Sequence, residues 1–182
     1  MVKWDDFLEI VDRNFKYLET EFGFRKVSTQ IPSVEYESSF LRISIYYDIA
    51  NRKELDVGIW PLQTIRRKGE RFGIGSLVKL HNPDPDESED YMSPFPLTKE
   101  QLEIEVQKYA ALLLKYGSDV LHGDLLDLFI WVKVAIEASE IMRTPQPGKS
   151  IVQVFKEVAR KYAIEHLKEH AREHQHKDDS KS

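Results

Sequence analysis

The chain has 182 residues, and its 41% hydrophobic and 31% charged residues are typical of a globular protein rather than a disordered one. It contains no cysteine, so disulfides, thiolate metal sites and a cysteine nucleophile are excluded. The net charge of -5 disfavours nucleic acid as a partner, because phosphate neutralisation needs a basic surface, and it suits a basic protein better.

The first predicted element is an amphipathic helix over residues 4–22. Gly23 follows directly and predicts the end of this helix. The apolar residues that recur at helical spacing are Trp4, Phe7, Leu8, Val11, Phe15, Leu18 and Phe22. The acidic start of the segment lacks an uninterrupted apolar run, so we expect no secretory signal.

Four strands are predicted after this helix, beginning with one at about residues 25–30. Apolar and polar residues then alternate over 34–37, 41–47 and 55–60, which indicates strands with one buried face. The polar sides of the last two carry Arg42, Ser44 and Tyr46, and Asp56, Gly58 and Trp60. Short connectors predict antiparallel hairpins.

Three helices are predicted after an irregular segment at 63–97. The first begins at Thr98, a capping residue, and is interrupted by Gly117 and the following Ser118 and Asp119. The second covers roughly 124–143 and is followed by a linker at 144–150. The third begins near Ser150, and its predicted packed side holds Ile151, Phe155, Val158 and Tyr162.

The predicted fold class is therefore α+β, with an N-terminal helix packed on a four-stranded antiparallel meander and three C-terminal helices behind it. We expect a single domain over 1–167, made of helix plus sheet at 1–62, the irregular segment at 63–97 and a helical layer at 98–167. Residues 168–182 form a polar, His-rich tail.

The second of these C-terminal helices is apolar nearly all round between Leu128 and Ile136. Such a helix lies at the centre of a domain or is covered by another subunit, so a homodimer through the 125–141 helix is one alternative. The apolar stretch 125–136 is too short to span a bilayer and contains two charged residues. We therefore expect a cytoplasmic protein with no membrane partner.

Four of the six histidines fall in EHLKEHAREHQH, residues 165–176. A pair such as His166 and His170 can chelate a metal ion adventitiously. His174 cannot join them on one ion, because it lies about 12 Å from His166 along a helix axis. No large apolar residue after Leu167 would support a site, so we predict a solvated helix end, no functional metal site and no cofactor.

The acidic stretch NPDPDESEDY follows the calcium-loop template only in part. The template requires a glycine where Glu89 stands and a glutamate where Phe95 stands. We predict instead a contact patch for a basic protein, with an aromatic ring beside the charges. Its predicted partner-binding residues are Asp84, Asp86, Glu87, Glu89, Asp90 and Tyr91.

HGDLLD at 122–127 holds, by elimination, the best candidate for catalysis. His122 with Asp119, Asp124 or Asp127 could form an acid–base pair, which leaves a small-molecule or metal-dependent enzyme as an alternative function. The sequence shows no nucleophile motif and no glycine-rich oxyanion turn, so we predict no catalytic residue. The competing interpretation is a turn in which Asp124 caps the next helix.

The layout of YLETEFGF, VEYES, RISIYYDIANRKELDVGI and ALLLKYGSDVLHGD resembles that of small, uncharacterised bacterial α+β proteins. Some of these are grouped with immunity proteins of polymorphic toxin systems. The resemblance implies a protein that binds a toxin and blocks it. The predicted function is therefore that of a non-enzymatic protein-binding protein whose partner is another protein, such as a basic toxin.

Overall fold

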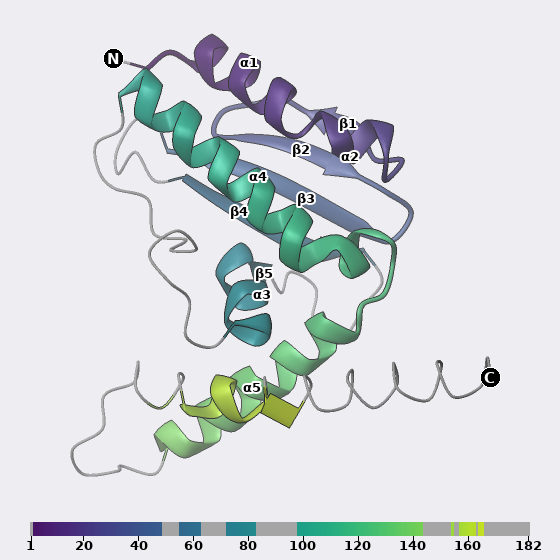
Figure 1. Ribbon diagram of the computed structural model, residues 1–182, viewed down its shortest axis with the longest axis vertical. Helices are drawn as coiled ribbons and strands as arrows, with labels where there is room; N and C mark the ends of the chain where they lie inside the picture. Colours follow the sequence, from purple (N-terminus) through teal and green to yellow (C-terminus); the bar gives the residue numbers. More distant parts are fainter. Residues whose placement is uncertain are drawn as a thin grey trace, which may run out of the picture.

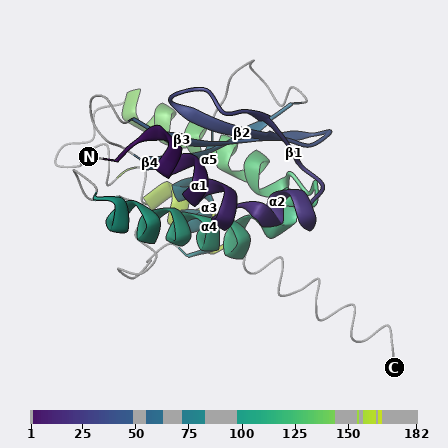
Figure 2. The ribbon, with the colours of Figure 1, turned by 90° about the horizontal axis from the view of Figure 1, so that it is seen from above.

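The computed structural model describes residues 2–48, 55–62, 72–82, 98–143, 154, 157–162 and 164–165. Its architecture is α+β, as predicted, with an N-terminal helix, an antiparallel meander sheet and several C-terminal helices (Figure 1). The two helices α1 (Trp4–Asn14) and α4 (Lys99–Leu121) lie on the same side of the sheet (Figure 2). No helix within the described ranges is long and apolar enough to cross a membrane.

The N-terminal helix predicted over 4–22 is interrupted, which corrects the prediction. α1 ends at Asn14, and a short helix α2 (Lys16–Thr20) follows after Phe15. The side-chain amide of Asn14 donates to the carbonyl oxygen of Ile10 at 2.9 Å and so competes with the helical backbone bond. Gly23 has a positive φ of 69°, as expected of a residue that ends a helix.

The sheet contains the four predicted strands and a fifth that was not predicted. The strands β1 (Arg25–Ser28), β2 (Ser33–Glu37), β3 (Leu41–Tyr47) and β4 (Leu55–Pro61) pair in chain order, all antiparallel. β5 (Phe72–Gly73) pairs with β4. A strand of two residues is too short for alternation to reveal, and it lies in the segment predicted to be irregular.

The core lies between the inner face of the sheet and the two helices that cover it. The sheet contributes Val34, Tyr36, Leu41, Ile43, Ile45, Tyr47, Leu55, Val57 and Ile59, all of them buried. The helices contribute Phe7, Ile10 and Val11 from α1, and Leu102, Val106, Tyr109 and Leu113 from α4. The alternation that predicted these strands therefore identified their buried face correctly.

α1 and α4 run side by side in the same direction. Lys99 at the start of α4 binds Asp6 with 2.7 Å between Nζ and Oδ1, and this hydrogen bond holds the pKa of Asp6 below its ordinary value. One helix turn further along, Arg13 pairs with Glu103. The Tyr17 hydroxyl of α2 donates to the Ala110 carbonyl oxygen at 3.0 Å. Three polar contacts thus fix the alignment of the N-terminal helices on α4.

The helix α3 (Ile74–His81) lies within the segment predicted to be irregular, which is a second correction. α4 begins where predicted, and the Thr98 hydroxyl accepts a hydrogen bond from the backbone N–H of Gln101. It does not stop near Gly117 as predicted but continues to Leu121. A Cβ on Gly117 would lie 2.9 Å from Cδ1 of Leu113 and 3.2 Å from Cδ1 of Leu77, so this glycine makes room for side chains of α4 and α3 rather than ending α4.

The helix α5 (Leu126–Arg143) is helical as predicted and buries only part of its surface. Val134 and Ala138 pack with Val154, Val158 and Ala159 in a second, smaller core. This packing confirms Val158 as a buried residue of the last helix, of which the structure describes residues 157–162 and 164–165. Ile151, Phe155, the linker at 144–150 and the tail at 168–182 lie outside the described residues.

Two tyrosines provide a matched test of the core, in which Tyr36 is fully buried and Tyr17 is half-buried against it. Tyr17 donates a hydrogen bond, whereas the Tyr36 hydroxyl is buried without a hydrogen-bond partner among the described residues. We expect Tyr17→Phe to lower the free energy of unfolding by about 1 kcal/mol, because a formed bond is lost. Tyr36→Phe should leave it unchanged or raise it by up to about 1 kcal/mol, because an unpaired hydroxyl is removed from the core. Urea denaturation at neutral pH measures both values.

The same two residues should contribute to the loss of stability in alkali. Burial raises the pKa of both phenols above the ordinary 10.0. Above that pH the unfolded chain releases phenolic protons that the folded chain retains, so the stability present below pH 10 is lost as pH rises. Tyr36→Phe should therefore reduce the loss measured between neutral pH and about pH 11. An equally steep loss in wild type and Tyr36→Phe would contradict this expectation.

Candidate functional site

Several residues singled out in the sequence lie outside the described ranges. They include the predicted partner-binding residues Asp84, Asp86, Glu87, Glu89, Asp90 and Tyr91, and the histidines His166, His170, His174 and His176. Their roles stay predictions. Among the residues that the structure does describe, no group of three or more metal-ligating side chains is arranged to hold an ion.

His122 does not meet the carboxylates proposed for it. It is exposed at the C-terminal end of α4, where its ring Nδ1 donates to the Ser118 carbonyl oxygen at 2.9 Å. Its ring packs edge-on against Phe22, with 4.7 Å between centroids. Asp124 instead accepts a hydrogen bond from the backbone N–H of Leu126 at 3.0 Å, as the capping interpretation predicted. The acid–base pair of the enzyme alternative is therefore not formed by His122.

Asp127 turns away from His122 and pairs with His81. The distance between His81 Nε2 and Asp127 Oδ2 is 2.6 Å, and the Asp127 side chain is only 8% exposed. His81 is the last residue of α3 and Asp127 lies in the first turn of α5, so the pair joins these two helices. The Tyr116 ring of α4 stacks on the imidazole, with 5.9 Å between centroids.

The pair of His81 and Asp127 was missed in the sequence because its members are 46 residues apart. No local spacing connects them, and only the packing of α3 against α5 brings them together. The carboxylate fixes the orientation of the imidazole, which is how a base is positioned in many enzymes. Here the pair has a clear structural role, since it bridges two helices with little exposed surface.

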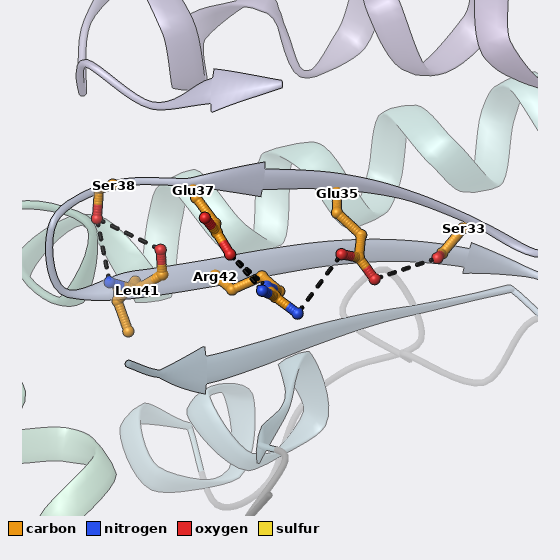
Figure 3. A network of polar contacts seen from close by, with 6 residues as sticks. All are labelled: Ser33, Glu35, Glu37, Ser38, Leu41 and Arg42. Carbon is orange, nitrogen blue, oxygen red and sulfur yellow. Dashed lines mark hydrogen bonds and ion pairs between the residues drawn. The ribbon is translucent and has the colours of Figure 1, made fainter. Parts of the chain in front are cut away.

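The outer face of the sheet carries an ordered set of charges (Figure 3). Arg42 of β3 lies between two carboxylates of β2. Its Nε donates to Glu37 Oε1 at 2.7 Å, and its Nη1 lies 3.7 Å from Glu35 Oε2. The Ser33 hydroxyl donates to Glu35 at 3.5 Å. The Arg42 side chain remains 42% exposed, so this network is held in place while still facing solvent.

Two aromatic residues share the outer face with this network. Trp60 of β4 is directly opposite Arg42, and Tyr46 lies on the same side of β3 as Arg42. Both aromatic residues are half-buried. The alternation in the sequence assigned Arg42, Tyr46 and Trp60 to the polar side of their strands, and the structure confirms this. Sequence reasoning did not anticipate that these three residues would gather on one surface.

A second exposed surface is formed by one face of α5. Apolar Leu126, Phe129 and Ile136 are 49%, 45% and 37% exposed, and Lys133 and Glu140 are exposed between and beside them. These five residues have the spacing of a single helix face. We refer to them as the α5 stripe. This helix is apolar nearly all round in the sequence because both its buried side and its solvent-facing side carry apolar residues.

Comparison of the chain with protein-family models, with curated proteins and with solved structures finds no match in any of the three.

Proposed function

We propose that the protein acts by binding another protein, and that the outer face of the sheet is the contact surface. The observation that carries the proposal is the gathering of Arg42, Tyr46 and Trp60 on this face in partly exposed positions. Arg, Tyr and Trp are the residue types that contribute most of the binding energy at protein interfaces. No competing arrangement of catalytic side chains is formed around His122.

The network around Arg42 favours binding because it is already ordered. Glu35 and Glu37 hold the guanidinium before any partner arrives. An arginine that is free in solution loses side-chain entropy when it is fixed at an interface, at a cost of about 0.5–1.5 kcal/mol. Here much of that cost is met during folding, so contact with a partner requires less further ordering.

The charges of the outer face favour a basic partner. Glu35, Glu37 and Asp56 contribute three carboxylates, against the guanidinium groups of Arg25 and Arg42. The whole chain carries a net charge of -5, which adds long-range attraction for a cationic protein. The resemblance to immunity proteins supplies the class of partner, and we propose that it is a basic toxin that this protein neutralises.

The proposal is tested by capture followed by titration. Tagged protein is purified from its native host, and a stoichiometric partner is identified by mass spectrometry and then produced alone. We expect this partner to be basic, to stop growth when expressed alone and to be harmless when co-expressed. Isothermal titration should show Trp60→Thr and Tyr46→Thr each raising Kd by about 30-fold or more, the loss expected of a hot-spot residue.

A matched control is Ile104→Thr, which changes an exposed apolar residue on the opposite, helical side of the sheet. It should leave Kd unchanged. Equal binding by all three variants would exclude the outer face as the contact surface. An acidic or harmless partner would contradict the toxin-binding proposal, and the absence of any stoichiometric partner would contradict protein binding itself.

A further inference from the structure

The α5 stripe exposes three large apolar side chains on one helix face, whereas a solvated helix face is usually polar. Leu126, Phe129 and Ile136 lie along one side of a helix of 18 residues, which is about 27 Å long. Another side of the helix is already packed, since Leu128 belongs to the main core, and Val134 and Ala138 belong to the second core. An exposed apolar row bordered by charges is characteristic of an interaction surface.

We propose that the α5 stripe binds the same stripe of a second copy of this chain, with the two helices antiparallel about a two-fold axis beside Ile136. In this register Ile136 meets its own copy at the axis. Lys133 of each chain faces Glu140 of the other, so two equivalent ion pairs flank the centre. Phe129 then lies outside each ion pair, beside the C-terminal end of the partner's helix.

The charges on the stripe select this arrangement. Lys133 and Glu140 are exposed, and neither has an ion-pair partner among the described residues of its own chain. They are seven residues apart, which is about two helical turns. An isologous pair of antiparallel helices therefore matches each lysine to a glutamate twice, because every contact in such an interface occurs in duplicate.

Other arrangements of two copies bring like charges together. Parallel helices in register would place Lys133 against Lys133 and Glu140 against Glu140. Sliding the antiparallel partner by about two turns, to oppose Phe129 to Ile136, would also bring the two copies of Lys133 face to face. Like charges opposite each other across an interface are unfavourable. The antiparallel register centred on Ile136 avoids this repulsion, buries Ile136 at the axis and covers Phe129 with the end of the partner's helix.

The test is a charge-swap series measured by sedimentation equilibrium over a wide range of concentrations. Wild type should dimerise in a concentration-dependent manner. Lys133→Glu and Glu140→Lys should each weaken the dimer by about tenfold or more, because two attractive pairs become two repulsive ones. The double variant Lys133→Glu/Glu140→Lys should restore the dissociation constant to within about threefold of wild type, because the pairs form again with their signs exchanged.

Two control variants change surfaces away from the α5 stripe. Ile104→Glu changes the most exposed apolar residue of α4, which is 62% exposed, and should leave the dimer intact. Trp60→Thr alters the proposed partner-binding face and should dimerise like wild type, so failure of one proposal leaves the other standing. Circular dichroism and thermal melting confirm that each variant folds.

Three results would overturn the proposal. Wild type that stays monomeric at every concentration would show that a second copy does not bind the stripe. Single variants that dimerise as well as wild type would exclude contacts by Lys133 and Glu140. A double variant no better than the single ones would exclude this register, because only a lysine facing a glutamate of the other chain is rescued by exchanging them.

Discussion

Phe7→Ala is expected to lower the free energy of unfolding by about 3–5 kcal/mol, the usual cost of removing a fully buried aromatic ring. The Phe7 side chain is 0% exposed, and its ring centroid lies 5.0 Å from that of Trp4 and 5.4 Å from that of Tyr47. It therefore attaches α1 to β3 at the inner face of the sheet. Truncation of Phe7 loses the free energy gained by transferring its ring from water into the core, and it also loses the packing contacts of the ring. Neighbouring residues do not replace these contacts fully, because a densely packed core closes only in part around the cavity.

Equilibrium denaturation in urea measures this loss. Ile104→Ala serves as the control, because Ile104 is 62% exposed and should change the free energy of unfolding by no more than about 0.5 kcal/mol. A similar loss in both variants would mean that Phe7 is not part of the packed core. A change of slope with urea in Phe7→Ala would indicate that α1 separates from the sheet before the rest unfolds.

Asp127→Ala is expected to lower the free energy of unfolding by about 2–3 kcal/mol. It removes the carboxylate that lies 2.6 Å from His81 and leaves the imidazole beside a small cavity at the joint of α3 and α5. Asp119→Ala is a matched control, since Asp119 is exposed near the C-terminal end of α4, where a negative charge is unfavourable. That control should leave stability unchanged or slightly raised.

A double-mutant cycle isolates the contact itself. His81→Ala, Asp127→Ala and the double variant should give a coupling energy of about 1–3 kcal/mol between the two side chains. Additive losses would show that each residue acts through other neighbours and that the pair does not join the helices. Because both variants remove polar groups at one joint, near-ultraviolet circular dichroism is also expected to report a change around Tyr116, whose ring stacks on His81.

The sequence predicts the sheet well because alternation depends only on neighbouring residues. Arg42, Tyr46 and Trp60 fall on one face for that reason. Periodicity fails to reveal the helix break at Phe15, because apolar residues keep their helical spacing through the break between α1 and α2. Phe15 and Leu18 are both buried, so the pattern is preserved while the backbone leaves the helix.

The candidate sites depend on contacts that no local pattern contains. His81 pairs with Asp127 only because α3 packs on α5, and α3 itself was hidden in a segment rich in turn-forming residues. Gly117 was interpreted as a helix end because glycine usually ends helices, yet it lies within α4 and leaves room for Leu113 and for Leu77 of α3. The structural role of such residues depends on tertiary contacts, and these contacts cannot be identified from a single sequence.

The parallel pairing of α1 with α4 also bears on the order of folding. The contacts that align these helices join residues 90 and 93 positions apart. Hairpin partners such as Leu41 and Pro61 are separated by about 20 positions at most, so closing the longer loop costs about 1.3 kcal/mol more in chain entropy. The hairpins can therefore close early, and the part of the inner face that α4 covers becomes buried only when α4 docks. Docking of α4 thus completes the main core, to which α4 contributes Leu102, Val106, Tyr109 and Leu113.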